Sequence, residues 1–329
     1  MKVNSSLISK YRTQLMGIGT LMIIACHATG NGISFPQKII SFLSYGNWGV
    51  DIFLFLSGLG LYCSLNKGGS TISFYYKRFI RVFIPYWIIT IPFAIFYLFT
   101  GRDNLCTFLQ YITTMGFWLH HKGAWFVSLL VPLYLITPVL FKVARIGGVI
   151  RNMAVILLIG LCITLHFSSI TQLGKEYILY NVEFTYWRIP SFLLGMFSAP
   201  HLNKETSNKI IYFYVFCFFS YLAALKVMHV SIPWLITPPL VLFLAFLCQY
   251  IEKIGKAFCA LTMAGSVSLE SYLYNIYFNG LSRFIEPDYL HSPIFNYGIP
   301  YIGIIVIGLS MAYFTNTIIK KRIIPIITL

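Results

Sequence analysis

Long apolar stretches alternate with short polar segments along nearly the whole chain. A helix needs roughly 20 apolar residues to cross a bilayer, so each stretch of about that length predicts a transmembrane helix. The expected fold is an all-α, polytopic bundle of ten spans that forms one transmembrane domain, 1–329. The predicted spans are 13–31, 48–66, 79–100, 123–141, 150–168, 184–200, 210–228, 232–251, 262–281 and 298–319.

The basic residues predict the orientation of these helices, because lysine and arginine concentrate on the cytoplasmic side of a membrane. With both termini cytoplasmic, 17 of the 24 basic residues fall on the inner side. The other seven are Lys38, Arg102, Lys122, Lys175, Arg188, Lys226 and Arg283. Counting the apolar run 103–119 as a crossing would place the basic segment 142–151 outside. We therefore expect this run to lie at the outer face or to be re-entrant.

The composition excludes the usual soluble classes, because 58% of the residues are hydrophobic and only 10% are charged. The net charge of +15 comes from basic clusters between apolar runs. Such clusters mark the cytoplasmic face of a membrane and do not indicate a nucleic-acid partner. The seven cysteines are scattered, without the spacing of a metal or redox site, so no metal is expected.

Three unlike polar residues fall in the outer halves of predicted helices. A rise of about 1.5 Å per residue places His27 roughly 20 Å above the inner end of the first helix. Asp51 and Arg188 lie about one turn below the outer ends of the second and sixth helices. Ionisable groups at such depth are costly and therefore candidates for function. We predict that Asp51 orients His27 as a general base toward a hydroxyl, and that Arg188 stabilises oxyanion charge.

Each of these residues also has a structural alternative that the sequence leaves open. His27 could hydrogen-bond a backbone carbonyl at a helix contact. Asp51 and Arg188 could form a buried ion pair. Glu270, near the middle of the ninth predicted helix, could serve only as a hydrogen-bond partner between helices.

Arg78 and Arg81 stand at the inner end of the third predicted helix, three residues apart and on one face. Their guanidinium groups could bind phosphate groups, because the planar fork suits phosphate geometry. The alternative is that they orient the helix and contact lipid headgroups. For the neighbouring Lys77 we expect only this second role.

Several stretches carry a pattern that is more specific in combination than each is alone. They read LMGIGTLMIIACH, GNWGVDIFLFLSGLGLY, FYYKRFIRVFIPYW, AWFVSLLVPLYLITPVLF, RIPSFLLGM and GSVSLESYLYN. Together they resemble the membrane acyltransferase family 3, the O-acetylating enzymes of bacterial envelopes. The likeness extends over nearly the whole chain.

The resemblance implies a ten-helix bundle of the bacterial cytoplasmic membrane. Such a bundle moves an acyl group, usually acetyl, from a cytoplasmic acyl-CoA to a carbohydrate hydroxyl. The family's essential histidine corresponds to His27, and its donor-binding arginines correspond to Arg78 and Arg81. Many members carry an arginine eleven residues before the histidine; here Met16 stands there, and either Arg12, one helical turn earlier, replaces it or the role is lost. The ninth-helix motif often ends in histidine, where this chain has Asn275.

The expected function is transfer from acetyl-CoA, or another short acyl-CoA, to a hydroxyl of an envelope glycan or lipid-linked saccharide. Transfer would finish within the lipid-embedded bundle or through a separate extracytoplasmic transferase. Trp125, Glu270 and Asn275 are predicted to contact substrate. A rival hypothesis is a proton-coupled exporter or a lipid or saccharide flippase, in which the same ionisable residues relay protons.

Overall fold

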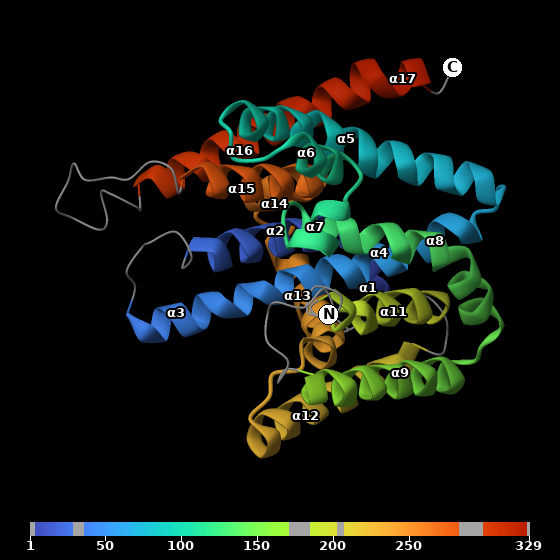
Figure 1. Cartoon of the computed structure of the whole chain (residues 1–329). Coiled ribbons are helices and arrows are strands. Elements are labelled where there is room, and N and C mark those ends of the chain that lie inside the picture. Colours follow the sequence, from blue (N-terminus) through green and yellow to red (C-terminus); the bar gives the residue numbers. More distant parts are fainter. Residues whose placement is uncertain (1–3, 29–35, 171–184, 203–206, 283–298, 328–329) are drawn as a thin grey trace. The chain divides into compact units, whose positions relative to one another are not determined.

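The computed structural model describes residues 4–28, 36–170, 185–202, 207–282 and 299–327 (Figure 1). Every regular element within these residues is helical, which confirms the all-α prediction. The ends of three predicted spans, 29–31, 184 and 298, lie outside the described residues. So do four of the basic residues that set the predicted orientation: Lys2, Lys175, Lys204 and Arg283.

Seven helical segments of the described chain are long and apolar enough to cross a membrane. They are Gln37–Asn66, Thr71–Phe99, Trp125–Ile146, Val149–His166, Asn208–Met228, Pro233–Ile251 and Tyr301–Ile323. The protein is therefore a multi-pass membrane protein. Three further predicted spans fall on shorter helices: α2 (Arg12–Ala28), α11 (Ile189–Ser198), and the pair α14 (Gly255–Ser266) and α15 (Ser268–Ser282). The count of ten crossings stays a prediction.

The apolar run 103–119 forms two short helices, α6 (Leu105–Ile112) and α7 (Met115–His120). Between them Thr114 adopts a left-handed conformation with a φ of 64°. Neither helix approaches the roughly 20 residues that a crossing needs. This agrees with the expectation that the run does not cross.

The contacts divide the chain into two compact units. Unit 1 comprises Met1–Gly19, Trp48–Phe74 and Leu133–Gly265, and unit 2 comprises Thr20–Asn47, Tyr75–Pro132 and Ser266–Leu329. The single transmembrane domain, 1–329, stays a prediction.

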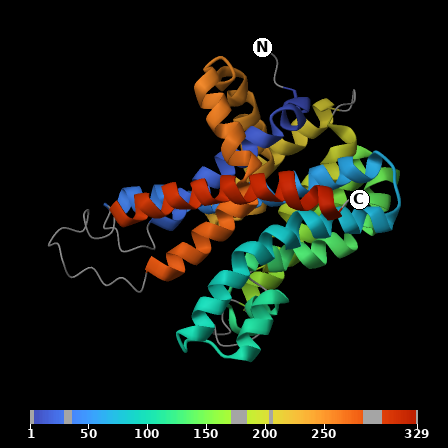
Figure 2. The ribbon, with the colours of Figure 1, turned by 90° about the horizontal axis from the view of Figure 1, so that it is seen from above.

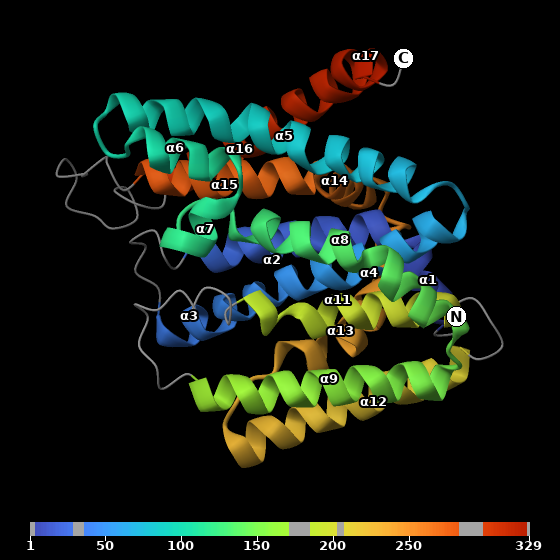
Figure 3. The ribbon, with the colours of Figure 1, turned by 45° about the vertical axis from the view of Figure 1, so that its right-hand side comes forward.

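Unit 1 is built around α4 (Trp48–Asn66) and α11. A Cβ on Gly58 would lie 2.2 Å from the carbonyl oxygen of Phe192, and one on Gly195 would lie 1.8 Å from that of Phe55. Small residues allow such close backbone packing in membrane helices. The other helices of this unit include α1 (Ser6–Lys10), α9 (Val149–Ile170), α12 (Ser207–Ala223) and α13 (Pro233–Ile251). Figure 3 shows α9 and α12 side by side.

Unit 2 is organised around α15. The Tyr277 hydroxyl donates to Thr90 on α5 (Thr71–Phe99) at 3.0 Å. Tyr274 shares a 2.9 Å hydrogen bond with Thr315 on α16 (Ile299–Ile318), which lies beside α15 in Figures 1 and 3. The unit also contains α3 (Gln37–Ser44), the start of α8 (Trp125–Ile146) and α17 (Ile324–Ile327).

Two aromatic side chains of α5 hold α6 against it. Tyr86 donates to the carbonyl of Tyr111, and the indole N–H of Trp87 donates to the carbonyl of Ile112 at 3.0 Å. The last carbonyls of a helix lack their usual partner within the helix, and these donors bond two of them; the Tyr111 carbonyl also accepts from the backbone N–H of Thr114 at 3.2 Å. The chain therefore turns back after α5, as Figure 2 shows.

Candidate functional site

His27 lies in the last turn of α2 and pairs with an asparagine of α15 in unit 2. Its Nδ1 lies 2.5 Å from Oδ1 of Asn275, and Nδ2 of Asn279 donates to the same oxygen at 3.2 Å. The two asparagines share one face of α15 because they are four residues apart. Asn275 is 5% exposed and His27 is half-buried. The amide oxygen of Asn275 thus receives two hydrogen bonds.

The start of α16 holds the turn of α2 that carries His27. The Tyr301 hydroxyl donates to the carbonyl of Ile24, and its ring packs with Ile24 and Ala28. Ile24 precedes His27 by less than one helical turn, so this contact holds the stretch of backbone that carries the imidazole. Nothing in the sequence pattern singles out Tyr301. The spacing of two asparagines on the ninth predicted helix is the only signal for Asn279.

The Asp51 carboxylate is engaged inside unit 1. Its Oδ2 accepts from the guanidinium of Arg188, and its Oδ1 accepts from the hydroxyl of Ser191 at 2.7 Å. Asp51 and Ser191 are 0% exposed, and Arg188 is 3% exposed. Arg188 and Ser191 share a face at the start of α11 because they are three residues apart. This is the buried ion pair that the sequence left open as an alternative.

Asp51 and His27 each have other partners in these contacts, and the predicted role of Asp51 in orienting His27 stays a prediction. The side chain that lies against Nδ1 is the amide of Asn275, and both oxygens of Asp51 are taken by Arg188 and Ser191. A buried carboxylate needs a cation more than a neutral imidazole, because leaving a buried charge unpaired costs about 3–5 kcal/mol. Direct roles of Asp51 and Arg188 in the chemistry stay predictions.

Arg78 and Arg81 lie near the start of α5, where Arg81 is exposed and Arg78 is half-buried. In the same unit, Glu270 of α15 accepts a 2.7 Å hydrogen bond from Nδ2 of Asn316 on α16. The positive charges of Lys320 and Arg81 also act on this carboxylate. Glu270 therefore links two helices beside cations, which fits its structural alternative.

Arg12 is the first residue of α2 and contacts α4 in unit 1. Its Nε donates to the carbonyl of Leu56 at 3.1 Å. Its guanidinium covers Gly60, where a Cβ would lie 2.6 Å from Nη2. Arg12 is therefore held by α4, and its predicted role as a replacement for an arginine at Met16 stays a prediction.

Trp125 begins α8 in unit 2 and is half-buried. Its ring packs edge-on against Phe126, with the ring centroids 6.1 Å apart. The backbone N–H of Phe126 donates to the Tyr272 hydroxyl at 3.1 Å, so α15 also holds the start of α8. Contact between Trp125 and a substrate stays a prediction.

A second histidine–asparagine pair lies in unit 1. Nδ2 of Asn152 donates to Nε2 of His201 at 3.1 Å and to the carbonyl of Ala144 at 2.9 Å. Oδ1 of Asn152 accepts from Arg151 at 3.3 Å. His201 is 6% exposed and Asn152 is 0% exposed. The sequence pattern does not single out this pair.

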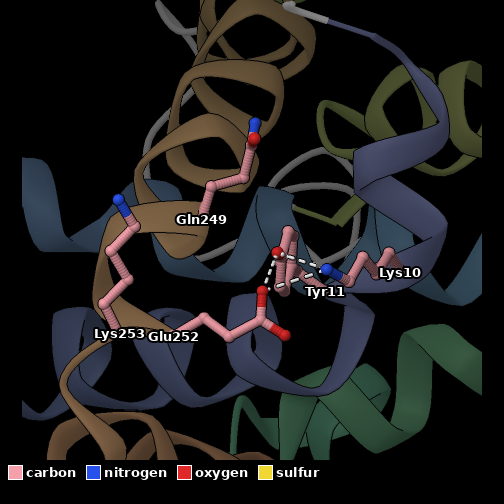
Figure 4. Close-up of a pocket in the computed structure, with 5 residues that line it drawn as sticks. All are labelled: Lys10, Tyr11, Gln249, Glu252 and Lys253. Atoms are coloured by element: carbon pink, nitrogen blue, oxygen red, sulfur yellow. Dashed lines mark hydrogen bonds and ion pairs between the residues drawn. The ribbon is translucent and has the colours of Figure 1, made fainter. Parts of the chain in front are cut away.

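A small pocket of about 360 Å³ lies at the end of α13 in unit 1 (Figure 4). It is lined by Lys10, Tyr11, Gln249, Glu252 and Lys253. The Lys10 amine lies 3.0 Å from the Glu252 carboxylate, which also accepts from Tyr11. Hydrogen bonds from Tyr11 and Lys10 lower the pKa of Glu252 below its usual 4.5. Gln249 and Lys253 point away from this ion pair, so the polar groups do not converge on one ligand position.

Comparison with known proteins adds one match. A family model described as an acyltransferase domain matches residues 14–323, which is nearly the whole chain. His27, Arg78, Arg81 and Asn275 lie inside the match, whereas Arg12 precedes it. No curated protein and no solved structure matches the chain.

Proposed function

Because the chain belongs to the membrane acyltransferase family 3, we propose that it transfers a short acyl group, with acetyl the first candidate. The donor is a cytoplasmic acyl-CoA, and the acceptor is a hydroxyl of an envelope glycan or lipid-linked saccharide at the bacterial cytoplasmic membrane. The observation that carries the proposal is the His27 imidazole, held at Nδ1 by Asn275. The same unit contains Arg78 and Arg81.

His27 acts as the general base through Nε2. The amide oxygen of Asn275 can only accept, so Nδ1 carries the proton of the neutral imidazole and Nε2 carries the lone pair. Nε2 removes the proton of the acceptor hydroxyl, and the hydroxyl oxygen attacks the thioester carbonyl. The C–S bond then breaks, and the CoA thiolate takes the proton from the imidazolium. The products are the ester and the free thiol of CoA, with no net change in protons.

The spacing along α5 suits a coenzyme A molecule. Thr90 follows Arg81 by nine residues, which corresponds to about 14 Å along a helix axis. Thr90 accepts a hydrogen bond from Tyr277 on α15. Tyr277 follows Asn275 by two residues, and Asn275 contacts His27. The two arginines of α5 would hold the phosphate groups, and the extended pantetheine arm would carry the thioester toward the imidazole.

The remaining predicted residues take different roles in this proposal. Trp125 offers a half-buried ring on which the apolar face of an acceptor sugar can pack. Glu270 lies near the charges of Arg81 and Lys320, and therefore on the donor side. Asp51 and Arg188 hold α4 and α11 together in unit 1.

The purified chain in detergent, given acetyl-CoA and an extract of envelope glycans, is expected to release free thiol. The His27→Ala variant is expected to release none above the rate without extract. A proton-coupled exporter or flippase would instead need sealed vesicles and a gradient, and it would release no thiol. Thiol release that is independent of both the extract and His27 contradicts the proposal.

A further inference from the structure

The tautomer of His27 depends on which end of the Asn275 amide faces it. An amide can present its oxygen or its NH₂ group by a half-turn about its last bond. With the oxygen toward Nδ1, the proton of neutral imidazole is on Nδ1 and the lone pair is on Nε2. With the NH₂ group toward Nδ1, the proton moves to Nε2, which then cannot take a proton from a hydroxyl.

We infer that Asn279 fixes the tautomer of His27 by locking the amide of Asn275 in the orientation that accepts. Nδ2 of Asn279 donates to the same oxygen that faces Nδ1, at 3.2 Å. A joint half-turn of both amides is opposed by the Tyr301 hydroxyl, which bonds to the Asn275 side chain and gives its own proton to the carbonyl of Ile24, so that it can only accept from the Asn275 NH₂ group. If the amide of Asn275 alone turned over, its NH₂ group would face the NH₂ group of Asn279. The hydrogen bond would be lost and two buried donors would oppose each other, which disfavours this orientation about tenfold or more.

Asn275 and Asn279 are thus positioning residues, which act on the reaction through His27. The kinetic consequence rests on the proposed function, whereas the tautomer is a property of the folded chain alone. A carboxylate at position 275 keeps the acceptor. A carboxylate at position 279 attracts the NH₂ group of Asn275 and therefore favours the opposite tautomer.

Four variants test this inference in detergent with acetyl-CoA and the envelope extract. Asn275→Leu removes the acceptor and is expected to lower kcat about 100-fold, with the KM for acetyl-CoA unchanged. Asn279→Asp is expected to lower kcat about tenfold or more. Asn275→Asp is expected to stay within about threefold of the wild type. The control is Tyr274→Phe, which removes a buried hydrogen bond of α15 to Thr315 and is expected to leave kcat unchanged.

A second measurement does not depend on activity. The ¹⁵N NMR spectrum of histidine-labelled protein, with His27 assigned by comparison with His27→Gln, reports which ring nitrogen carries the proton of neutral imidazole. The expected result is a proton on Nδ1 in the wild type and in Tyr274→Phe, and on Nε2 in Asn279→Asp.

A wild type with the proton on Nε2, or an Asn279→Asp variant with the wild-type tautomer, overturns the inference. Activity in Asn275→Leu equal to that of the wild type also overturns it. These results leave the proposed function standing if His27→Ala is inactive. If the wild type transfers no acyl group, the proposed function fails and the NMR result still decides the inference.

Discussion

Among the described residues, each compact unit shows one histidine–asparagine pair, and the two pairs have opposite hydrogen-bond directions. In unit 2 the oxygen of Asn275 faces Nδ1 of His27, and in unit 1 the NH₂ group of Asn152 faces Nε2 of His201. The Nε2 lone pair of His201 is therefore used to accept a hydrogen bond, whereas the pairing of His27 places a proton on Nδ1 and the lone pair on Nε2.

This difference separates a histidine that fills a core from one that can act as a base. Residue type and burial alone would favour His201, which is 6% exposed, over the half-buried His27 as the catalytic histidine. The orientation of the neighbouring amide decides which imidazole nitrogen can accept a proton. A buried histidine beside an asparagine is therefore not by itself a sign of catalysis.

The largest effect is expected on kcat, when each of the two histidines is replaced separately by alanine. His27→Ala should lower kcat for thiol release about 10³-fold, because it removes the general base. His201→Ala should stay within about threefold of the wild type in kcat while lowering thermal stability, because it removes one hydrogen bond of the buried Asn152 amide. Equal losses of activity in both variants, measured at matched amounts of folded protein, would remove the distinction between the pairs.

The next effect is on stability and concerns unit 1. Asp51→Asn is expected to destabilise the protein by about 3–5 kcal/mol, because it leaves the buried guanidinium of Arg188 without its counter-charge. Thermal denaturation in detergent checks this loss. The double variant Asp51→Leu with Arg188→Met should recover most of the loss, because an apolar pair needs no compensation. A single variant as stable as the wild type would show that the pair contributes little.

A smaller effect is expected at the donor side of unit 2. Arg81→Ala should raise the KM for acetyl-CoA about tenfold, because it removes a phosphate-binding fork, and it should change kcat less. Arg81→Lys should recover part of the loss, because charge remains without the planar geometry. Arg322→Ala serves as a matched control for lost surface charge, because Arg322 is exposed in the helical turn Ile319–Ile323 that follows α16. An equal rise in KM for both variants would mean that Arg81 acts only through its positive charge and does not bind the phosphate groups specifically.

The smallest effect is expected at the ion pair in unit 1 that lines the pocket of Figure 4. The lowered pKa of Glu252 means that its contribution to stability is present above pH 4.5 and is lost as the pH falls below that value. Hydrogen bonds to Tyr11 and Glu252 raise the pKa of Lys10 above 10.5, so the contribution of Lys10 is lost only above that pH. Melting curves of the wild type and Glu252→Gln should therefore differ at pH 7 and converge below pH 4.5. A difference that persists at low pH would point to a contact other than the ion pair.

The sequence predicts the long apolar helices well because length and composition alone decide whether a helix can cross a bilayer. It predicts the short elements less well. The helix α11 begins after Arg188 with Pro190 in its first turn and has only 10 residues, although the apolar pattern favours a span over 184–200. The break between α14 and α15 at Val267 likewise leaves no trace in the apolar pattern.

In the candidate site, too, the sequence predicts some features well and others poorly. His27 is recognisable because an ionisable group in an apolar run is rare, but its partner Asn275 lies 248 residues away. Periodicity assigns a residue to a face of its own helix and does not identify the helix that packs against that face. The sequence therefore suggests Asp51 as a partner of His27, whereas in unit 1 Asp51 forms an ion pair with Arg188.

The central claim is that the chain attaches an acyl group to an envelope sugar through His27. Mass spectrometry of envelope glycans tests it in cells that make the wild type, His27→Ala, His201→Ala or no copy of the chain. We expect a fixed mass increase of one acyl group per modified sugar with the wild type and His201→Ala, and none in the other two. An acylated glycan in cells that make His27→Ala, or identical glycans in all four, would contradict it.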